Sequence, residues 1–202
     1  MKEVNNFDVI IPYLNFNKSI HLVWLVQRNK DGNNCGNKGN KQRTIKSYYF
    51  QSVEKLQEKK EEIMQLCKQN NCRAYICVNT KPVVKVLFTL QSIVMDKLQE
   101  QLNHNSYLSL HGIIDSAVMK SGGDGNKLWV IDIDKDDIVF VNEIAAYINK
   151  QRSGFNTNAI TYFKTLKGYH LITHPFDCQN FNKKYPDIEI KKEGLTLLYA
   201  YV

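Results

Sequence analysis

The chain has 202 residues, of which 43% are hydrophobic, and a formal net charge of +7. This length and composition are typical of one globular domain, or of two small lobes packed together. The sequence has no run of 18 apolar residues and no apolar segment after Met1 typical of a signal peptide, so we expect a cytoplasmic protein without a membrane span. The basic charge favours a polyanionic partner, although solubility alone can account for it.

Five cysteines are spread along the chain at positions 35, 67, 72, 77 and 178. Their number is odd and no pair has Cys-x-x-Cys spacing, which argues against both a disulfide framework and a zinc knuckle. We expect reduced thiols.

The N-terminal part predicts a β-hairpin with a long tip. Ile20–Arg28 and Thr44–Phe50 are rich in branched and aromatic residues and predict strands. Between them, Lys30–Lys41 is dense in Gly, Asn and Lys and predicts a loop that is mobile without ligand. If single-stranded nucleic acid orders this loop, its candidate phosphate contacts are Lys30, Lys38, Lys41 and Arg43.

Two helices and a buried strand are predicted next. Ser52–Gln69 has apolar residues at helical spacing, and Arg73–Asn79 predicts a buried strand. Pro82 can open a helix that reaches Leu98. Residues 104–126 have mixed signals and end in a Gly-rich loop.

The second half predicts strands over 127–134, 158–164, 169–173, 187–191 and 195–201, and helices over 136–150 and 176–185. Gly194 predicts a turn between the last two strands. The pattern indicates an α/β (α+β) protein with a mixed sheet covered by helices. We expect residues 1–202 to form a single compact domain with two lobes, residues 1–103 and 127–202.

Two aspartates end an apolar run in Trp129-Val-Ile-Asp-Ile-Asp134. Because side chains alternate along a strand, Asp132 and Asp134 should project from one face, while Ile131 and Ile133 point into a core. Two carboxylates on one face repel each other unless a cation or protons relieve the repulsion. Mg²⁺ and Mn²⁺ prefer such oxygen ligands, so the pair predicts a metal site. The alternative is a strand end with ordinary surface acids.

A glycine and a histidine lie together in Lys167-Gly-Tyr-His170. Gly168 allows close backbone approach, and His170 can donate a hydrogen bond to a phosphate. Lys167 could neutralise triphosphate charge. A strand histidine is also often structural and a surface lysine often only solvated, so both interpretations stay open at this point.

The strand Asp187–Lys191 carries a third acid. Glu189 and Lys191 share one face of this strand. Glu189 could supply a third carboxylate beside the aspartates, and Lys191 could neutralise triphosphate charge. The alternative is a solvent-facing Glu–Lys ladder on an edge strand.

The order of these motifs resembles the archaeo-eukaryotic primase superfamily. The strand Ile131-Asp-Ile-Asp134 is followed by Gly168-Tyr-His170 and then by Ile188-Glu189. The resemblance covers residues 72–202 and includes the earlier strand Arg73–Asn79. It implies a largely antiparallel sheet in an RNA-recognition-like catalytic lobe, beside a smaller N-terminal αβ lobe.

The resemblance also implies roles for these residues. The catalytic ligands for Mg²⁺ or Mn²⁺ would be Asp132, Asp134 and Glu189, with Glu189 standing where the family usually has aspartate. By the same resemblance, His170 would contact the phosphates of the incoming nucleotide. The residues themselves add Gly168, Lys167 and Lys191, which lie near these motifs, to the predicted nucleotide-binding residues. The implied partners are nucleoside triphosphates, a single-stranded DNA or RNA template, and a separate helicase or accessory primase subunit.

We therefore expect an enzyme, a metal-dependent nucleotidyltransferase of the DNA primase or primase-polymerase type. One alternative is a non-catalytic nucleic-acid-binding module of the same fold, in which tyrosines such as Tyr48, Tyr49, Tyr162 and Tyr169 stack on bases. A second alternative is a metal-dependent phosphodiesterase that uses the same acids.

Overall fold

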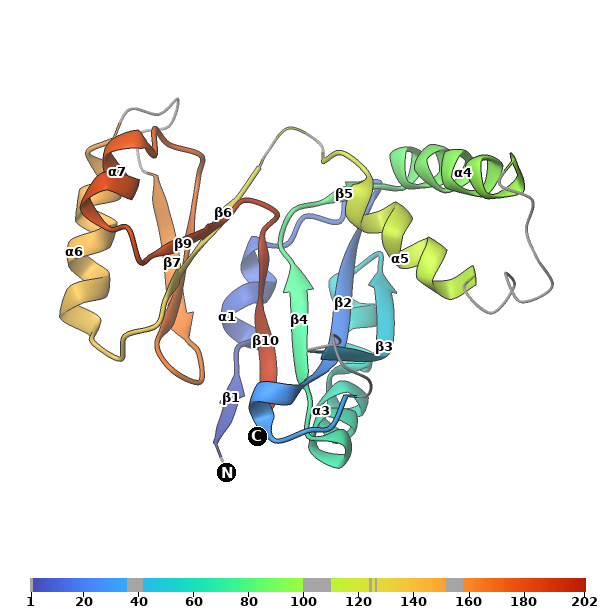
Figure 1. The fold of residues 1–202 in the computed structure, drawn as a ribbon, viewed down its shortest axis with the longest axis horizontal. Helices are drawn as coiled ribbons and strands as arrows, with labels where there is room; N and C mark the ends of the chain where they lie inside the picture. The colour runs from blue at the N-terminus through green and yellow to red at the C-terminus, as the bar shows by residue number, and fades with distance from the viewer. Residues whose placement is uncertain (1, 36–41, 100–109, 124, 126, 152–157) are drawn as a thin grey trace.

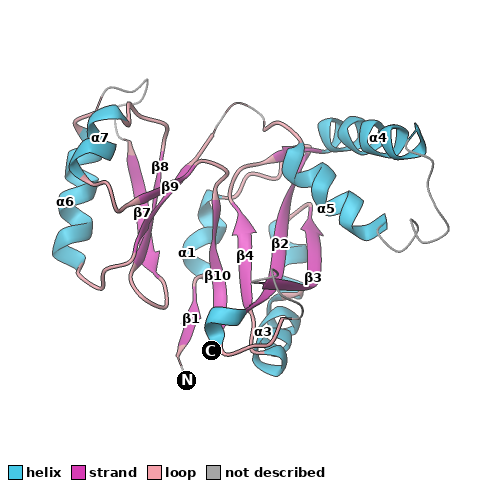
Figure 2. Ribbon diagram, viewed as in Figure 1, coloured by secondary structure: helices cyan, strands magenta, loops and turns pink. Residues whose placement is uncertain are grey.

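A computed structural model describes residues 2–35, 42–99, 110–123, 125, 127–151 and 158–202. The chain forms two antiparallel sheets with helices packed on them (Figures 1 and 2), which confirms the predicted α/β class. Within these residues, no helix is both long and apolar enough to cross a membrane.

The first sheet has six strands in the order β1-β10-β4-β2-β3, with β5 paired to β2. Its strands are β1 (Glu3–Asn5), β2 (Ser19–Arg28), β3 (Gln42–Phe50), β4 (Arg73–Cys77), β5 (Lys81–Pro82) and β10 (Leu195–Tyr201). The predicted hairpin of β2 and β3 is confirmed.

Short helices cover one face of the first sheet. They are α1 (Phe7–Ile10), the 3-10 turn η1 (Ile11–Tyr13), α2 (Val53–Glu58) and α3 (Lys60–Asn70). Phe7, Leu56 and Ile63 are fully buried in one core with Val23 and Leu25 of β2. These two strand residues share a face because side chains alternate along a strand.

The opposite face of β2 meets α4 (Val83–Gln99) and α5 (Leu110–Lys120). Ile20 and Leu22 form a small core there with Val86 of α4 and Val118 of α5. Figure 1 shows α4 extending beyond the sheet, with α5 beside it.

The second sheet has the strand order β7-β8-β6-β9. Its elements are β6 (Trp129–Ile133), α6 (Ile138–Asn149), β7 (Ala159–Lys164), β8 (Tyr169–Thr173), α7 (Gln179–Lys184) and β9 (Glu189–Lys191). This βαββαβ order is that of the split βαβ motif and matches the expected RNA-recognition-like arrangement. Ile131, Ile133 and Leu171 point to one face, where they pack with Ile144 of α6 and Phe181 of α7.

The two sheets share one core. Val130, Phe163 and Ile172, on the other face of the second sheet, belong to the same buried cluster as the first sheet's interior. After β9 the chain leaves the second sheet and returns to the first as β10, between β1 and β4. The turn predicted at Gly194 is confirmed, but the two strands that it joins belong to different sheets, so residues 127–202 do not form one lobe. The N-terminal sheet is the larger of the two, because it gains β10.

Three local predictions also differ from the structure. The helix predicted over residues 52–69 is two helices, separated at Lys59. Helix α5 lies in a region for which no element was predicted. The start of the predicted mobile loop is packed: η2 (Asn29–Asp31) places Asp31 against Arg73, and Cys35 is buried. Residues 36–41 lie outside the described residues.

Candidate functional site

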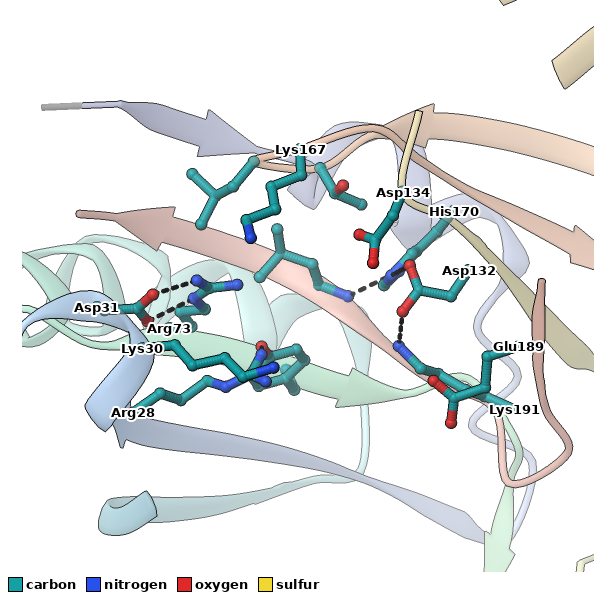
Figure 3. Close-up of a pocket in the computed structure, with 14 residues that line it drawn as sticks. Arg28, Lys30, Asp31, Arg73, Asp132, Asp134, Lys167, His170, Glu189 and Lys191 are labelled. Carbon is teal, nitrogen blue, oxygen red and sulfur yellow. Dashed lines mark hydrogen bonds and ion pairs between the residues drawn. The ribbon is translucent and has the colours of Figure 1, made fainter. Parts of the chain in front are cut away.

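A cleft of about 320 Å³ lies between the two sheets. Figure 3 shows its labelled side chains converging from both sheets. The second sheet and its β7–β8 turn contribute Asp132, Asp134, Thr165, Leu166, Lys167, His170, Glu189 and Lys191. The first sheet and η2 contribute Arg28, Lys30, Asp31, Arg73, Tyr75 and Leu197. All the side chains predicted for the site, with the exception of Gly168, line this one cleft.

Strand register aligns three of these residues across the second sheet. Asp132 on β6 lies opposite His170 on β8 and opposite Glu189 on β9. Directly opposed residues of antiparallel strands project from the same face. The row Glu189–Asp132–His170 therefore faces the cleft, whereas Ile131 and Ile133 face the helices.

Asp132 is held by two neighbours. Lys191 forms an ion pair with its Oδ2, and His170 Nε2 lies 3.2 Å from its Oδ1. Burial alone would raise the pKa of Asp132, but the hydrogen bond from His170 and the charge of Lys191 outweigh it. The pKa therefore lies well below its ordinary value, and the carboxylate stays ionised.

His170 is buried and engaged at both ring nitrogens. Its Nδ1 lies 2.7 Å from Thr196 Oγ1 and accepts a hydrogen bond from the Leu197 backbone N–H. An accepting Nδ1 leaves the proton on Nε2, which donates to Asp132. Burial lowers the pKa of His170, although Asp132 opposes this, so the ring is neutral. The histidine thus positions Asp132, and it would have to release that carboxylate to reach a phosphate.

Gly168 lies directly against the backbone at the end of β6, with no room for a side chain. A Cβ atom at this position would lie 2.0 Å from the Ile133 carbonyl oxygen and 2.7 Å from the Lys135 backbone nitrogen. Its amide also donates to Thr165 Oγ1 at 3.1 Å. The glycine therefore seats the β7–β8 turn, with Lys167, against the end of β6. Asp134 lies just beyond that strand end and is exposed.

The acids do not form an assembled metal centre. Carboxylate oxygens suit Mg²⁺ or Mn²⁺, but the ammonium of Lys191 already neutralises Asp132. Across the part of the chain that the structure describes, no group of three or more His, Cys, Asp or Glu side chains could hold a metal ion. A cation could bind at Asp132 only after Lys191 moved away from its carboxylate.

The facing wall is basic, and the sequence analysis missed most of it. Arg73 holds Asp31 through two hydrogen bonds, one of them from Nε to Oδ2 at 2.7 Å. Arg28 Nη1 donates to the Tyr75 hydroxyl at 2.9 Å. Lys30 also lines this wall and is exposed. The one available signal for Arg73 was a charged residue opening an otherwise apolar strand.

Comparisons of the chain with models of protein families, with curated proteins and with solved structures give no match. The function is therefore inferred from the cleft itself.

Proposed function

We propose that this chain is a metal-dependent nucleotidyltransferase that joins nucleotides on a nucleic-acid template, as a primase does. The proposal rests on one observation: the two walls of the cleft carry opposite charges. Asp132 and Glu189 lie in a row on an RNA-recognition-like sheet, opposite Arg28 and Lys30. A nucleoside triphosphate and its cation need both signs of charge close together.

Within the part of the chain that the structure describes, the cleft has charged side chains beyond its two ion pairs, and these support the binding of a nucleoside triphosphate. Arg73 is paired with Asp31, and Lys191 with Asp132. The cleft also carries the cations Arg28, Lys30 and Lys167 and the exposed acids Asp134 and Glu189. The cations suit phosphate oxygens, whereas the acids would repel phosphates unless a cation came with them.

The non-catalytic binding module has weaker support. Tyr48 is buried and donates to Glu62, so its ring is not free to stack on a base. Tyr162 lies opposite Leu171, and Tyr169 lies opposite Ile133, so both tyrosines project from the helix-covered face of the second sheet. These tyrosines do not form one stacking platform in the cleft.

Binding of a divalent cation at Asp132 would require Lys191 to leave Oδ2. Lysine suits such an exchange because it is a compact charge on a flexible stem. The released ammonium would then be placed to meet a phosphate. His170 would keep Asp132 ionised and oriented throughout.

The test measures incorporation of labelled nucleoside triphosphates on single-stranded DNA or RNA with Mn²⁺ or Mg²⁺, in parallel with cleavage of a labelled strand. Asp132→Asn and Asp134→Asn should each lower incorporation by about 100-fold or more, because each removes a carboxylate that would hold the cation accompanying the triphosphate. The control is Asp8→Asn, because the Asp8 side chain is 83% exposed on α1 and lies outside the cleft.

Strand cleavage without incorporation would identify a phosphodiesterase. Nucleic-acid binding that survives both cleft substitutions, in a protein that shows neither incorporation nor cleavage, would identify a binding module.

A further inference from the structure

Helix α4 exposes an unusual amount of apolar surface. The exposed fractions are 63% for Val84, 58% for Leu87, 69% for Phe88, 50% for Met95 and 54% for Leu98. Single exposed apolar residues are ordinary, but a contiguous set marks an interaction surface.

The five residues form one stripe along the helix. At 100° per residue, positions 84, 87, 88, 95 and 98 fall within an arc of about 100°. We call these five residues the α4 stripe. Val86 faces away from the stripe and is buried against Ile20, Leu22 and Val118. The helix is therefore anchored by one side and presents the other to solvent.

The α4 stripe is complementary to itself when two helices run antiparallel. Gln91, which is exposed, lies at its centre. Val84 and Leu98 are equally far from Gln91 on either side, and so are Leu87 and Met95. A two-fold axis at Gln91 would therefore set Val84 against Leu98 of the partner subunit, and Leu87 against Met95 of the partner subunit.

We propose that α4 is the interface of a homodimer in which two copies of the α4 stripe pack antiparallel about Gln91. Cyclic two-fold dimers are the commonest oligomers, and their interfaces are self-complementary. The five side chains expose on the order of 500 Å² of apolar surface per protomer, so the contact buries about 1,000 Å² in total, near the lower limit for a specific interface. The dimer is consequently weak and concentration-dependent. This proposal is independent of the cleft's chemistry.

The first experiment measures the mass of the full chain by sedimentation equilibrium over a concentration series from low micromolar to several hundred micromolar. The wild type should pass from monomer to dimer, and Leu87→Glu and Phe88→Glu should remain monomeric. Val139→Glu is the matched control, because Val139 is 73% exposed on α6, outside the stripe. A wild type that stays monomeric throughout, or a Leu87→Glu variant that dimerises as well as the wild type, overturns the proposal.

The second experiment tests the antiparallel register with oxidised glutathione. Two thiols introduced by Gln91→Cys should cross-link across the axis, as each gives up a proton and an electron while the glutathione disulfide is reduced. An equal mixture of Val84→Cys and Leu98→Cys proteins should cross-link as a heterodimer, whereas neither should do so alone. Cross-linking of Val84→Cys alone, without the heterodimer, overturns the antiparallel arrangement.

Discussion

The cleft holds two ion pairs that differ in rigidity. On the first sheet, Arg73 clamps Asp31 with two hydrogen bonds, and the two side chains are 14% and 4% exposed. On the second sheet, Lys191 meets Asp132 through a single ammonium, and these side chains are 26% and 20% exposed. A planar guanidinium fixes a carboxylate in one orientation, whereas a lysine on a flexible stem is easily redirected. The first pair is therefore structural, and the second can be exchanged for a ligand.

The largest expected effect comes from breaking the rigid pair. Arg73→Ala leaves the Asp31 carboxylate buried without a partner, so we expect the free energy of unfolding to fall by about 3–5 kcal/mol. Urea denaturation measures this loss. The double variant Arg73→Met with Asp31→Leu should recover most of it, because no uncompensated charge remains. A single variant as stable as the wild type would show that the pair is not structural.

A smaller loss of unfolding free energy is expected from a substitution in the β7–β8 turn, which carries Lys167. Gly168→Ala forces a Cβ into the Ile133 carbonyl, and we expect a loss of roughly 1–3 kcal/mol together with displacement of the turn. The matched control is Gly112→Ala in helix α5, where a Cβ meets nothing within 4 Å. That change should stabilise the protein by up to about 1 kcal/mol. Equal stability of the two variants in urea would contradict the close approach.

The neutral state of His170 predicts how stability depends on pH. Its pKa is lower in the folded protein than the ordinary value of 6.5, because burial disfavours the imidazolium. On acidification through that value the unfolded chain therefore binds a proton that the folded chain does not, and stability falls with pH. In urea denaturation at a series of pH values, His170→Gln should reduce the dependence of the free energy of unfolding on pH, in the range between neutral pH and the pKa of His170 in the folded protein.

His174 serves as the control for this slope. Its pKa is also lowered by burial, although that residue is less buried, so His174→Gln should remove a smaller part of the slope. An unchanged pH profile in His170→Gln would show that His170 titrates normally in the folded protein.

The smallest effect on stability is expected from the exchangeable pair. Lys191→Ala should cost about 1 kcal/mol, because Asp132 keeps the hydrogen bond from His170 and stays partly solvated. The same change removes the cation that competes at Asp132, so Mn²⁺ should bind several-fold more tightly. Isothermal titration with Mn²⁺ compares wild type, Lys191→Ala and Asp132→Asn. Weaker Mn²⁺ binding in Lys191→Ala would show that the metal does not replace Lys191.

Much of the fold was predictable because its signals are local. The strand residues Ile20–Arg28 and Tyr169–Thr173 are branched and aromatic, and both form strands as predicted. Asp137 accepts hydrogen bonds from the Val139 and Phe140 amides, and the predicted helix begins there. Helix α5 was missed because Gly112 and its mixed surroundings weaken its helical signal.

The site was predictable only in part. Alternation along β6 was enough to place Asp132 on one face and Ile131 on the other. The ion pair between Asp132 and Lys191 could not be predicted. The two residues are diagonal neighbours on β6 and β9, and the register of these strands cannot be deduced from the residues around either one. Arg28 was also missed, since it reaches the cleft only when the two sheets pack together.

The sequence by itself determined most of the segments that become strands and helices, and which face of each strand is apolar, because backbone preference and alternation act over a few residues. The tertiary structure decided where those segments go. It sent β10 back to the first sheet and brought the acidic row opposite Arg28 and Lys30. It also left the α4 stripe exposed, because apolar residues surround that helix and only packing selects which side is buried.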